Sequence, residues 1–227
     1  MRIDRVTITG ADDNVRHYDL AKIADEFKFV EWGILISRNK EGREARYPSR
    51  QWIDRLFART SPIMATSGHL CGRWSREVAT GPLTWGLVRN RQFNSFGRLQ
   101  FNGVDEIDRL ALANLATISN CCVKDVIVQC KNFDAPNRHG REEPLRLLDL
   151  SGGRGIRLEH FPAPTAPYCG YAGGFGPDNL EGVLIALAGM PGEECWVDME
   201  SGVRTGDDFD LDKVRRCLEI AAPFIKE

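Results

Sequence analysis

Eight short β-rich runs recur along the whole chain, and this regular recurrence constrains the fold more than any other feature. Their centres lie about 20 to 33 residues apart, which is the spacing of units made of one strand and one helix. Dividing the 227 residues evenly among eight such units gives about 28 residues each. The runs are Ile3–Thr9, Val30–Ile36, Ile63–His69, Phe96–Phe101, Val126–Cys130, Leu145–Leu150, Tyr168–Ala172 and Cys195–Met199.

Helical periodicity fills several of the intervals between these runs. Apolar residues at positions i, i+3, i+4 and i+7 begin at Leu20 and again at Leu180, and further apolar stripes run through 107–118 and 211–225. The segment Gly176-Pro177-Asp178 is typical of a helix start, since proline is favoured in the first turn. Strands that alternate with helices predict either a closed parallel barrel or an open doubly wound sheet.

The strand count favours the closed barrel. No Gly-x-Gly-x-x-Gly pattern follows the first run, which weakens the dinucleotide-binding alternative. We therefore predict a single domain, residues 1–227, with the (β/α)8 or TIM-barrel fold. The chain is shorter than the ~250 residues typical of this fold. Because prolines and glycines crowd the segments after the fifth and sixth runs, we expect one or two helices there to be reduced to loops.

Composition excludes several classes of function. Thirty Lys and Arg residues face 32 Asp and Glu residues, so the basic excess of a nucleic-acid-binding protein is missing. No apolar run approaches the ~20 residues of a membrane helix, and no signal peptide is visible. Seven cysteines without a Cys-x-x-Cys pair indicate a reducing compartment. We expect a cytoplasmic monomer or homodimer with no nucleic-acid or membrane partner.

Glycine-rich loops follow the seventh and eighth runs. Gly173 and Gly174 follow the seventh, and Ser201 and Gly202 follow the eighth. Glycines let backbone N–H groups approach an anion, and loops after strands seven and eight often form a phosphate site in this fold. The simpler interpretation is that each loop only makes a tight turn. Taken together, the two loops predict a phosphorylated small molecule as the ligand.

These loops also carry a family resemblance. The segments Gly-Gly-Phe-Gly-Pro-Asp-Asn-Leu (173–180) and Val-Asp-Met-Glu-Ser-Gly-Val (197–203) are similar to the paired loops of phosphoribosylanthranilate isomerase, a family of tryptophan biosynthesis. Three other segments resemble that family's strands two, four and six: Arg46-Tyr47-Pro48-Ser49, Leu99-Gln100-Phe101-Asn102-Gly103 and Leu147-Leu148-Asp149. The resemblance spans nearly the whole chain and is strongest in the last two loops.

The resemblance implies an Amadori-type aldose–ketose isomerisation of a ribosylamine 5-phosphate. Asp149 matches the general acid that protonates the furanose ring oxygen, and an aspartate buried at a barrel mouth can hold a proton near neutrality. Arg46 matches the residue that meets the anthranilate carboxylate, which a guanidinium can bind with two hydrogen bonds. Asn102 stands at a substrate-binding position that is histidine in the family. We expect no cofactor and no metal ion, because His69-x-Cys71 is too sparse for a metal site.

The sequence departs from the family at the general base. Thr9 stands where the family has its catalytic cysteine, and a hydroxyl without an adjacent base cannot replace a thiolate. Ser151 or Gly152 replaces a lysine of many members, and Glu200 replaces the first serine of the last loop. Thr9 and Asp149 remain the candidate catalytic residues. A replacement base could come from other residues near strand ends, namely Asp12, Asp13, His69, Cys71, Cys130, Lys131 and Glu200, with Lys131 also able to form a Schiff base.

Two classes of function stay open at this point. The first is a phosphosugar isomerase with a displaced base, and it is favoured because Asp149 and Arg46 both remain. The second is a non-catalytic or re-purposed phosphosugar-binding barrel that has lost the base. A lyase or aldolase on the same barrel is a weaker variant, because this fold hosts many reactions.

Overall fold

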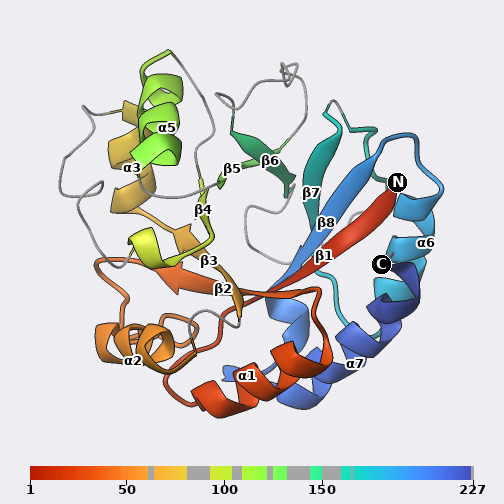
Figure 1. The fold of residues 1–227 in the computed structure, drawn as a ribbon, viewed down its shortest axis with the longest axis horizontal. Coiled ribbons are helices and arrows are strands. Elements are labelled where there is room, and N and C mark those ends of the chain that lie inside the picture. Colours follow the sequence, from red (N-terminus) through yellow and green to blue (C-terminus); the bar gives the residue numbers. More distant parts are fainter. Residues whose placement is uncertain are drawn as a thin grey trace.

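The computed structural model describes residues 1–60, 64–80, 93–103, 109–121, 125–131, 144–149, 160–164 and 166–225. Its centre is a closed barrel of eight strands in the order β1 to β8, and every neighbouring pair is parallel (Figure 1). The predicted (β/α)8 barrel is confirmed. The strands are β1 Arg2–Thr9, β2 Val30–Ile36, β3 Ala65–Leu70, β4 Arg98–Phe101, β5 Asp125–Cys130, β6 Leu145–Leu148, β7 Tyr168–Ala172 and β8 Glu194–Met199.

Helices cover the outside of the barrel (Figure 1). The apolar stripes at Leu20 and Leu180 lie on the buried faces of α1 and α6, as the periodicity predicts. Asp210 caps α7, because its carboxylate accepts hydrogen bonds from the N–H groups of Asp212 and Lys213. The described helices are α1 His17–Glu26, α2 Arg50–Thr60, α3 Arg73–Thr80, α5 Arg109–Cys121, α6 Leu180–Ala188 and α7 Leu211–Ala221, with 3-10 turns η1 Phe93–Ser95, η2 Ser201–Val203 and η3 Ala222–Phe224.

Most residues of β2, β3, β4 and β8 are buried, because a parallel barrel covers both faces of its sheet. All seven residues of β2 are buried, including Glu31. Closure joins β1 to β8, where Val6 pairs with Val197 and Ile8 with Met199. A short antiparallel pair, β9 (Arg204–Thr205) and β10 (Asp208–Phe209), follows η2.

Several predicted strand limits need correction. The fourth strand begins at Arg98 rather than Phe96, because the Phe96 ring packs edge-on against Phe57 of α2 at 4.9 Å. The third strand runs to Leu70, and the sixth ends at Leu148, one residue before Asp149. Ile63 and Leu150, at the predicted ends of these strands, lie outside the described residues.

The predicted loss of helices concerns segments that are only partly described. Residues 132–143 after β5 and 150–159 after β6 lie outside the described residues, as do Ser151 and Gly152. Residues 160–164, which the structure does describe, have no regular secondary structure. None of the described helices is long and apolar enough to cross a membrane.

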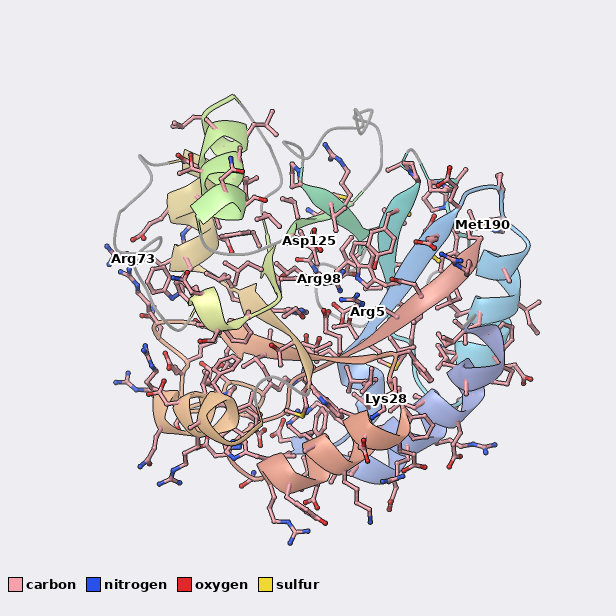
Figure 2. All side chains as sticks on the ribbon, viewed as in Figure 1. Arg5, Lys28, Arg73, Arg98, Asp125 and Met190 are labelled. Carbon is pink, nitrogen blue, oxygen red and sulfur yellow. The ribbon has the colours of Figure 1, made fainter. Side chains whose placement is uncertain are left out.

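A buried ion pair lies in the barrel interior near the amino ends of the strands. Arg98 of β4 donates to both carboxylate oxygens of Glu31 on β2, at 2.9 and 2.5 Å. Arg5 adds a third hydrogen bond to Glu31, at 2.9 Å, and the Arg98 guanidinium lies over the Trp196 ring. Since β3 separates β2 from β4, these side chains meet across the interior, where Figure 2 shows Arg5 and Arg98 at the centre of the view. The opposite end of the barrel is left for a ligand.

Candidate functional site

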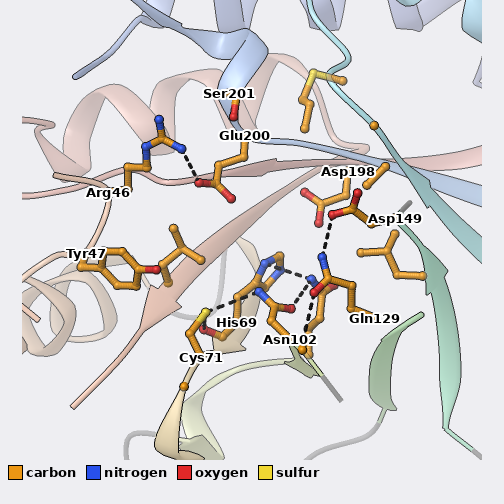
Figure 3. A pocket seen from close by; sticks show the side chains of 18 of the residues that line it. Arg46, Tyr47, His69, Cys71, Asn102, Gln129, Asp149, Asp198, Glu200 and Ser201 are labelled. Carbon is orange, nitrogen blue, oxygen red and sulfur yellow. Dashed lines mark hydrogen bonds and ion pairs between the residues drawn. The ribbon is translucent and has the colours of Figure 1, made fainter. Parts of the chain in front are cut away.

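A pocket of about 860 Å³ opens at the carboxyl ends of the strands. This is the end at which barrels of this fold place their ligands, and the volume suits a small molecule. Figure 3 shows the polar side chains that converge there. Most predicted site residues line the pocket, namely Arg46, Asn102, Asp149, Gly173, Gly174 and Ser201.

Asp149 lies at the pocket wall directly after β6. Its backbone N–H donates to the Cys130 carbonyl at 2.9 Å, which fixes the residue against the end of β5. The side-chain amide of Gln129 donates to Asp149 Oδ2 at 2.6 Å, and the backbone N–H of Gly103 donates to Gln129 Oε1 at 3.2 Å. The carboxyl group is thus buried but held in one orientation at the pocket surface. Sequence reasoning missed Gln129, because an amide inside a strand gives no signal of its own.

Thr9 is buried and hydrogen-bonded to a second carboxylate. Its hydroxyl donates to Asp198 Oδ1 at 2.8 Å. Thr9 is the last residue of β1 and Asp198 the last but one of β8, so closure of the barrel brings them together. A β-carbon on Gly33 of β2 would lie 2.1 Å from Thr9 Oγ1, so only glycine leaves room for the hydroxyl. Asp198 lines the pocket, whereas Thr9 stands behind it.

Asp198 has the properties of a proton-transfer group. Burial raises the pKa of Asp198 to about 7, against the hydrogen bond from Thr9, which lowers it. A carboxyl group with this pKa exchanges protons readily near neutral pH. Asp198 belongs to the motif Val-Asp-Met-Glu-Ser-Gly-Val, from which no role for it was predicted. The available signal was an acidic residue that follows the apolar residues Cys195, Trp196 and Val197 near the carboxyl end of the strand.

His69 and Cys71, two of the candidate bases, are both poorly suited to the task. Burial lowers the pKa of His69 to about 4, so the imidazole is neutral. Its Nδ1 lies 3.3 Å from the side-chain amide of Gln100, and its Nε2 lies 3.0 Å from Ser67 Oγ. Burial also raises the pKa of the Cys71 thiol to about 11. Asn102 donates to Cys71 Sγ at 3.4 Å and accepts from Gln100 at 3.0 Å, so the network ends at the pocket surface.

The remaining candidates for the replacement base are of two kinds, those that hold loops in place and those that line the pocket. Asp13 accepts hydrogen bonds from the backbone and hydroxyl of Ser49, at 2.6 and 2.5 Å, and lies outside the pocket lining. Asp12 lies outside it too, and it accepts from the buried Arg204 at 3.3 Å. These two aspartates hold loops in place rather than facing a ligand. Cys130, Lys131 and Glu200 do line the pocket.

Arg46 is held in place by its backbone and paired through its side chain. Its φ of +77° is rare for a residue other than glycine, and its backbone N–H donates to Asp12 Oδ2 at 3.1 Å. Its guanidinium donates to Glu200 Oε1 at 2.9 Å. Burial raises the pKa of Glu200, while the Arg46 guanidinium lowers it. The arginine expected to bind a ligand carboxylate is therefore already paired with a carboxylate of the protein.

The loops after β7 and β8 pack against each other through their backbones. A β-carbon on Gly202 would lie 1.9 Å from the Phe175 carbonyl oxygen, so this contact requires glycine. Gly202 thus supports the pocket from behind, while Gly173, Gly174 and Ser201 line it. No described residue accepts a hydrogen bond from the backbone N–H of Gly174, Ser201 or Gly202. Such N–H groups are suitable donors for an anion.

A metal site has no support from the part of the chain that the structure describes. No group of three or more His, Cys, Asp and Glu residues there could hold a metal ion. The described charged residues of the pocket lining are Lys40, Glu44, Arg46, Lys131, Asp149, Asp198, Glu200 and Asp207.

Comparison with solved structures bears on the fold. The phosphoribosyl anthranilate isomerase of Thermus thermophilus is 19% identical, with 96% of this chain and 98% of that chain covered and a TM-score of 0.63. TrpF of Jonesia denitrificans is also 19% identical, with 97% and 98% covered and a TM-score of 0.66. A DUF72 family protein of Thermotoga maritima is 11% identical, with 96% and 98% covered and a TM-score of 0.53.

The chain therefore has the fold of phosphoribosylanthranilate isomerases over nearly its whole length. The expected resemblance is confirmed at the level of the fold. No protein-family model matches the sequence, and a search of curated proteins finds no significant match.

Proposed function

We propose that this protein is a phosphosugar isomerase related in activity to phosphoribosylanthranilate isomerase. The reaction is the Amadori-type conversion of a ribosylamine 5-phosphate into a 1-amino-1-deoxyribulose 5-phosphate. One observation carries the proposal: two buried carboxyl groups, Asp149 and Asp198, line one pocket beside a loop pair suited to phosphate. An aldose–ketose isomerisation needs one group that gives a proton and one that takes a proton.

In the first step, Asp149 is the general acid. Its proton goes to the furanose ring oxygen, the bond between C1 and that oxygen breaks, and the nitrogen lone pair forms a C=N bond. The hydrogen bond from Gln129 keeps the carboxyl group oriented during this transfer. The product of the step is an open-chain iminium ion.

In the second step, Asp198 is the general base. It takes the proton from C2, and the electron pair of that C–H bond forms a C1=C2 double bond while the C=N bond returns its electrons to nitrogen. The resulting enol then gives the ketone by losing its O2 proton and gaining a proton at C1. A pKa of about 7 leaves much of Asp198 ionised at neutral pH and still basic enough to accept this proton.

Thr9 has a positioning role in this proposal. The threonine hydroxyl stands where the resemblance expects a thiolate. In this proposal the general base is instead the Asp198 carboxylate, which the hydroxyl contacts at 2.8 Å. Its hydrogen bond favours the ionised form of Asp198, because a carboxylate accepts a hydrogen bond better than a carboxylic acid. The missing cysteine is therefore compatible with catalysis.

The phosphate group is assigned to the loops after β7 and β8. The donors are the backbone N–H groups of Gly174 and Ser201, which line the pocket, and α6 begins nearby at Leu180. The side-chain oxygen of Asn179 accepts from Gly176 N–H at 2.9 Å, and its nitrogen donates to the Gly174 carbonyl at 3.0 Å. These two hydrogen bonds hold the loop in shape before a ligand arrives.

The experiment measures turnover of several N-substituted ribosylamine 5-phosphates, phosphoribosylanthranilate among them, by NMR detection of the new ketone. Asp149→Asn and Asp198→Asn should each lower kcat by about 10²- to 10⁴-fold, the usual contribution of a general acid or base. Asp54→Asn, on the exposed face of α2, is the matched control and should leave kcat unchanged.

Deuterium at C2 of the substrate distinguishes the two steps. A primary isotope effect on kcat is expected when removal of the C2 proton limits the rate. A folded wild-type protein that converts no ribosylamine 5-phosphate would overturn the proposal. An Asp198→Asn variant with wild-type kcat would remove Asp198 from the mechanism.

The setting of the reaction stays a prediction. We propose the cytoplasm as the compartment, which agrees with the absence of a disulfide at Cys71, Cys130, Cys169, Cys195 and Cys217. We propose a phosphorylated small molecule as the ligand and a monomer or homodimer as the assembly. Gel filtration with light scattering tests the assembly.

A further inference from the structure

We infer that the ion pair between Arg46 and Glu200 selects ribosylamine phosphates whose nitrogen substituent carries no carboxylate. The inference rests on the proposed function and goes beyond it, because it names the chemical class of the substituent. The two atoms that define it, Arg46 Nη1 and Glu200 Oε1, lie 2.9 Å apart in the pocket lining.

The position of Arg46 is built into the fold. Its backbone N–H is bound by Asp12, and Asp12 is in turn paired with Arg204. Arg204 is buried and also donates to the Gly10 carbonyl at 2.7 Å, at the end of β1. A chain of hydrogen bonds thus runs from the barrel to the Arg46 backbone. The backbone from which the Arg46 side chain extends is therefore fixed. Its partner Glu200 lies directly after β8.

The pair is also partly shielded from water. The Arg46 and Glu200 side chains are 30% and 25% exposed, unlike the surface pair Arg50 and Asp54, at 54% and 58%. Charge pairs that lose water keep more of their attraction, because the local dielectric constant is lower. A ligand carboxylate that displaced Glu200 from Arg46 would place two negative charges side by side, that of Glu200 and its own.

The pocket wall formed by the segment between β2 and α2 is balanced in charge. Lys40 and Arg46 are its cations between β2 and α2, and Lys40 Nζ lies 2.9 Å from Glu44 Oε2. Each of these cations therefore has an acidic partner within the pocket lining. Leu35 and the ring of Tyr47 supply apolar surface between them. With the phosphate on the loops after β7 and β8, a substituent extending to this side meets a charge-balanced and partly apolar wall, which suits an uncharged group.

The lining as a whole has more acidic than basic residues. Its described acids are Glu44, Asp149, Asp198, Glu200 and Asp207, and its described bases are Lys40, Arg46 and Lys131. A second negative group on a ligand that already carries phosphate has to displace Glu44 or Glu200 from its cation, and the displaced carboxylate repels it. The ion pair between Arg46 and Glu200 and the charges of the pocket lining both favour an uncharged substituent.

The test compares two stable product analogues by titration calorimetry. One is reduced 1-(2-carboxyphenylamino)-1-deoxyribulose 5-phosphate, and the other is the same molecule without its carboxylate. Wild-type protein should bind the analogue without the carboxylate at least tenfold more tightly. In Glu200→Gln the guanidinium of Arg46 is released, so the carboxylated analogue should gain at least tenfold and the preference should shrink or reverse.

Glu44→Gln is the matched control, because it removes an equal charge from the same lining and leaves Arg46 paired. It should keep the wild-type preference. Equal binding of the two analogues by wild type, or equal effects of Glu44→Gln and Glu200→Gln, would overturn the inference alone. If wild type binds neither analogue while its circular dichroism shows a folded barrel, the proposed function fails and the inference fails with it.

Discussion

The guanidinium of Arg98 binds both carboxylate oxygens of Glu31 across the barrel interior, and both side chains are buried. Arg98→Met should lower the free energy of unfolding by about 3–5 kcal/mol, because it leaves the Glu31 carboxylate buried with less compensation. Urea denaturation measures the change. Arg50→Met is the control on an exposed pair and should cost less than about 1 kcal/mol. Equal losses in the two variants would show that the interior pair adds nothing specific.

Asp198 should reduce stability as the pH rises. Its pKa is about 7 in the folded protein, above the ordinary value of 3.8, so the folded state binds the proton more tightly. Stability is then lost as the pH rises from about 4 through 7, because the unfolded chain ionises first. Asp198→Asn should therefore raise the free energy of unfolding at pH 8 by about 2 kcal/mol or more, and much less at pH 4. Denaturation curves at both pH values test this, and an equal effect at the two would contradict it.

The rate of isomerisation should depend on the ionisation of Asp198. If Asp198 is the base, kcat rises with pH through a midpoint near 7. Thr9→Val removes the hydrogen bond that lowers this pKa, so the midpoint should move to higher pH. Profiles of kcat between pH 5 and 9 for both proteins give the comparison. A midpoint that stays in place after the substitution would mean that Thr9 does not influence the base.

Gly33 is the residue on which the position of Thr9 depends. In Gly33→Ala the new β-carbon would lie 2.1 Å from Thr9 Oγ1 and 2.9 Å from the His69 ring. We expect a loss of about 1–3 kcal/mol of stability from overpacking, together with a fall in kcat. Gly182→Ala on α6 is the counterpart, since its β-carbon meets nothing within 4 Å. It should stabilise the helix by roughly 0.5–1 kcal/mol and leave kcat unchanged.

Local pattern was sufficient to predict the architecture. The eight strands follow from short β-rich runs at regular spacing, and α1, α5, α6 and α7 coincide with predicted apolar stripes. Helices α2 and α3 were not predicted: α3 is only eight residues long, with Val78 as a buried apolar residue among charged ones. Short helices of this kind are stabilised by tertiary packing rather than by their own sequence.

The site was predictable only where it depends on single residues. Asp149 and Arg46 lie in the pocket, as the resemblance implied. The roles of their neighbours depend on pairs that are distant in sequence: Thr9 and Asp198 are 189 residues apart, and Arg46 and Glu200 are 154 apart. No local pattern encodes such a pair, because the fold alone brings its members together. The contact between Thr9 and Asp198, on which the proposed role of Asp198 rests, therefore became visible only in three dimensions.

Pairing of β1 with β8 has a consequence for synthesis of the chain on the ribosome. The first strand emerges long before its second partner, and at ~5–20 residues per second the wait is roughly 10 to 40 s. During that interval one edge of β1 has unpaired backbone groups that can recruit a strand from another nascent chain. We expect the yield of native protein to be most sensitive to substitutions in β8, since only that strand ends the exposure.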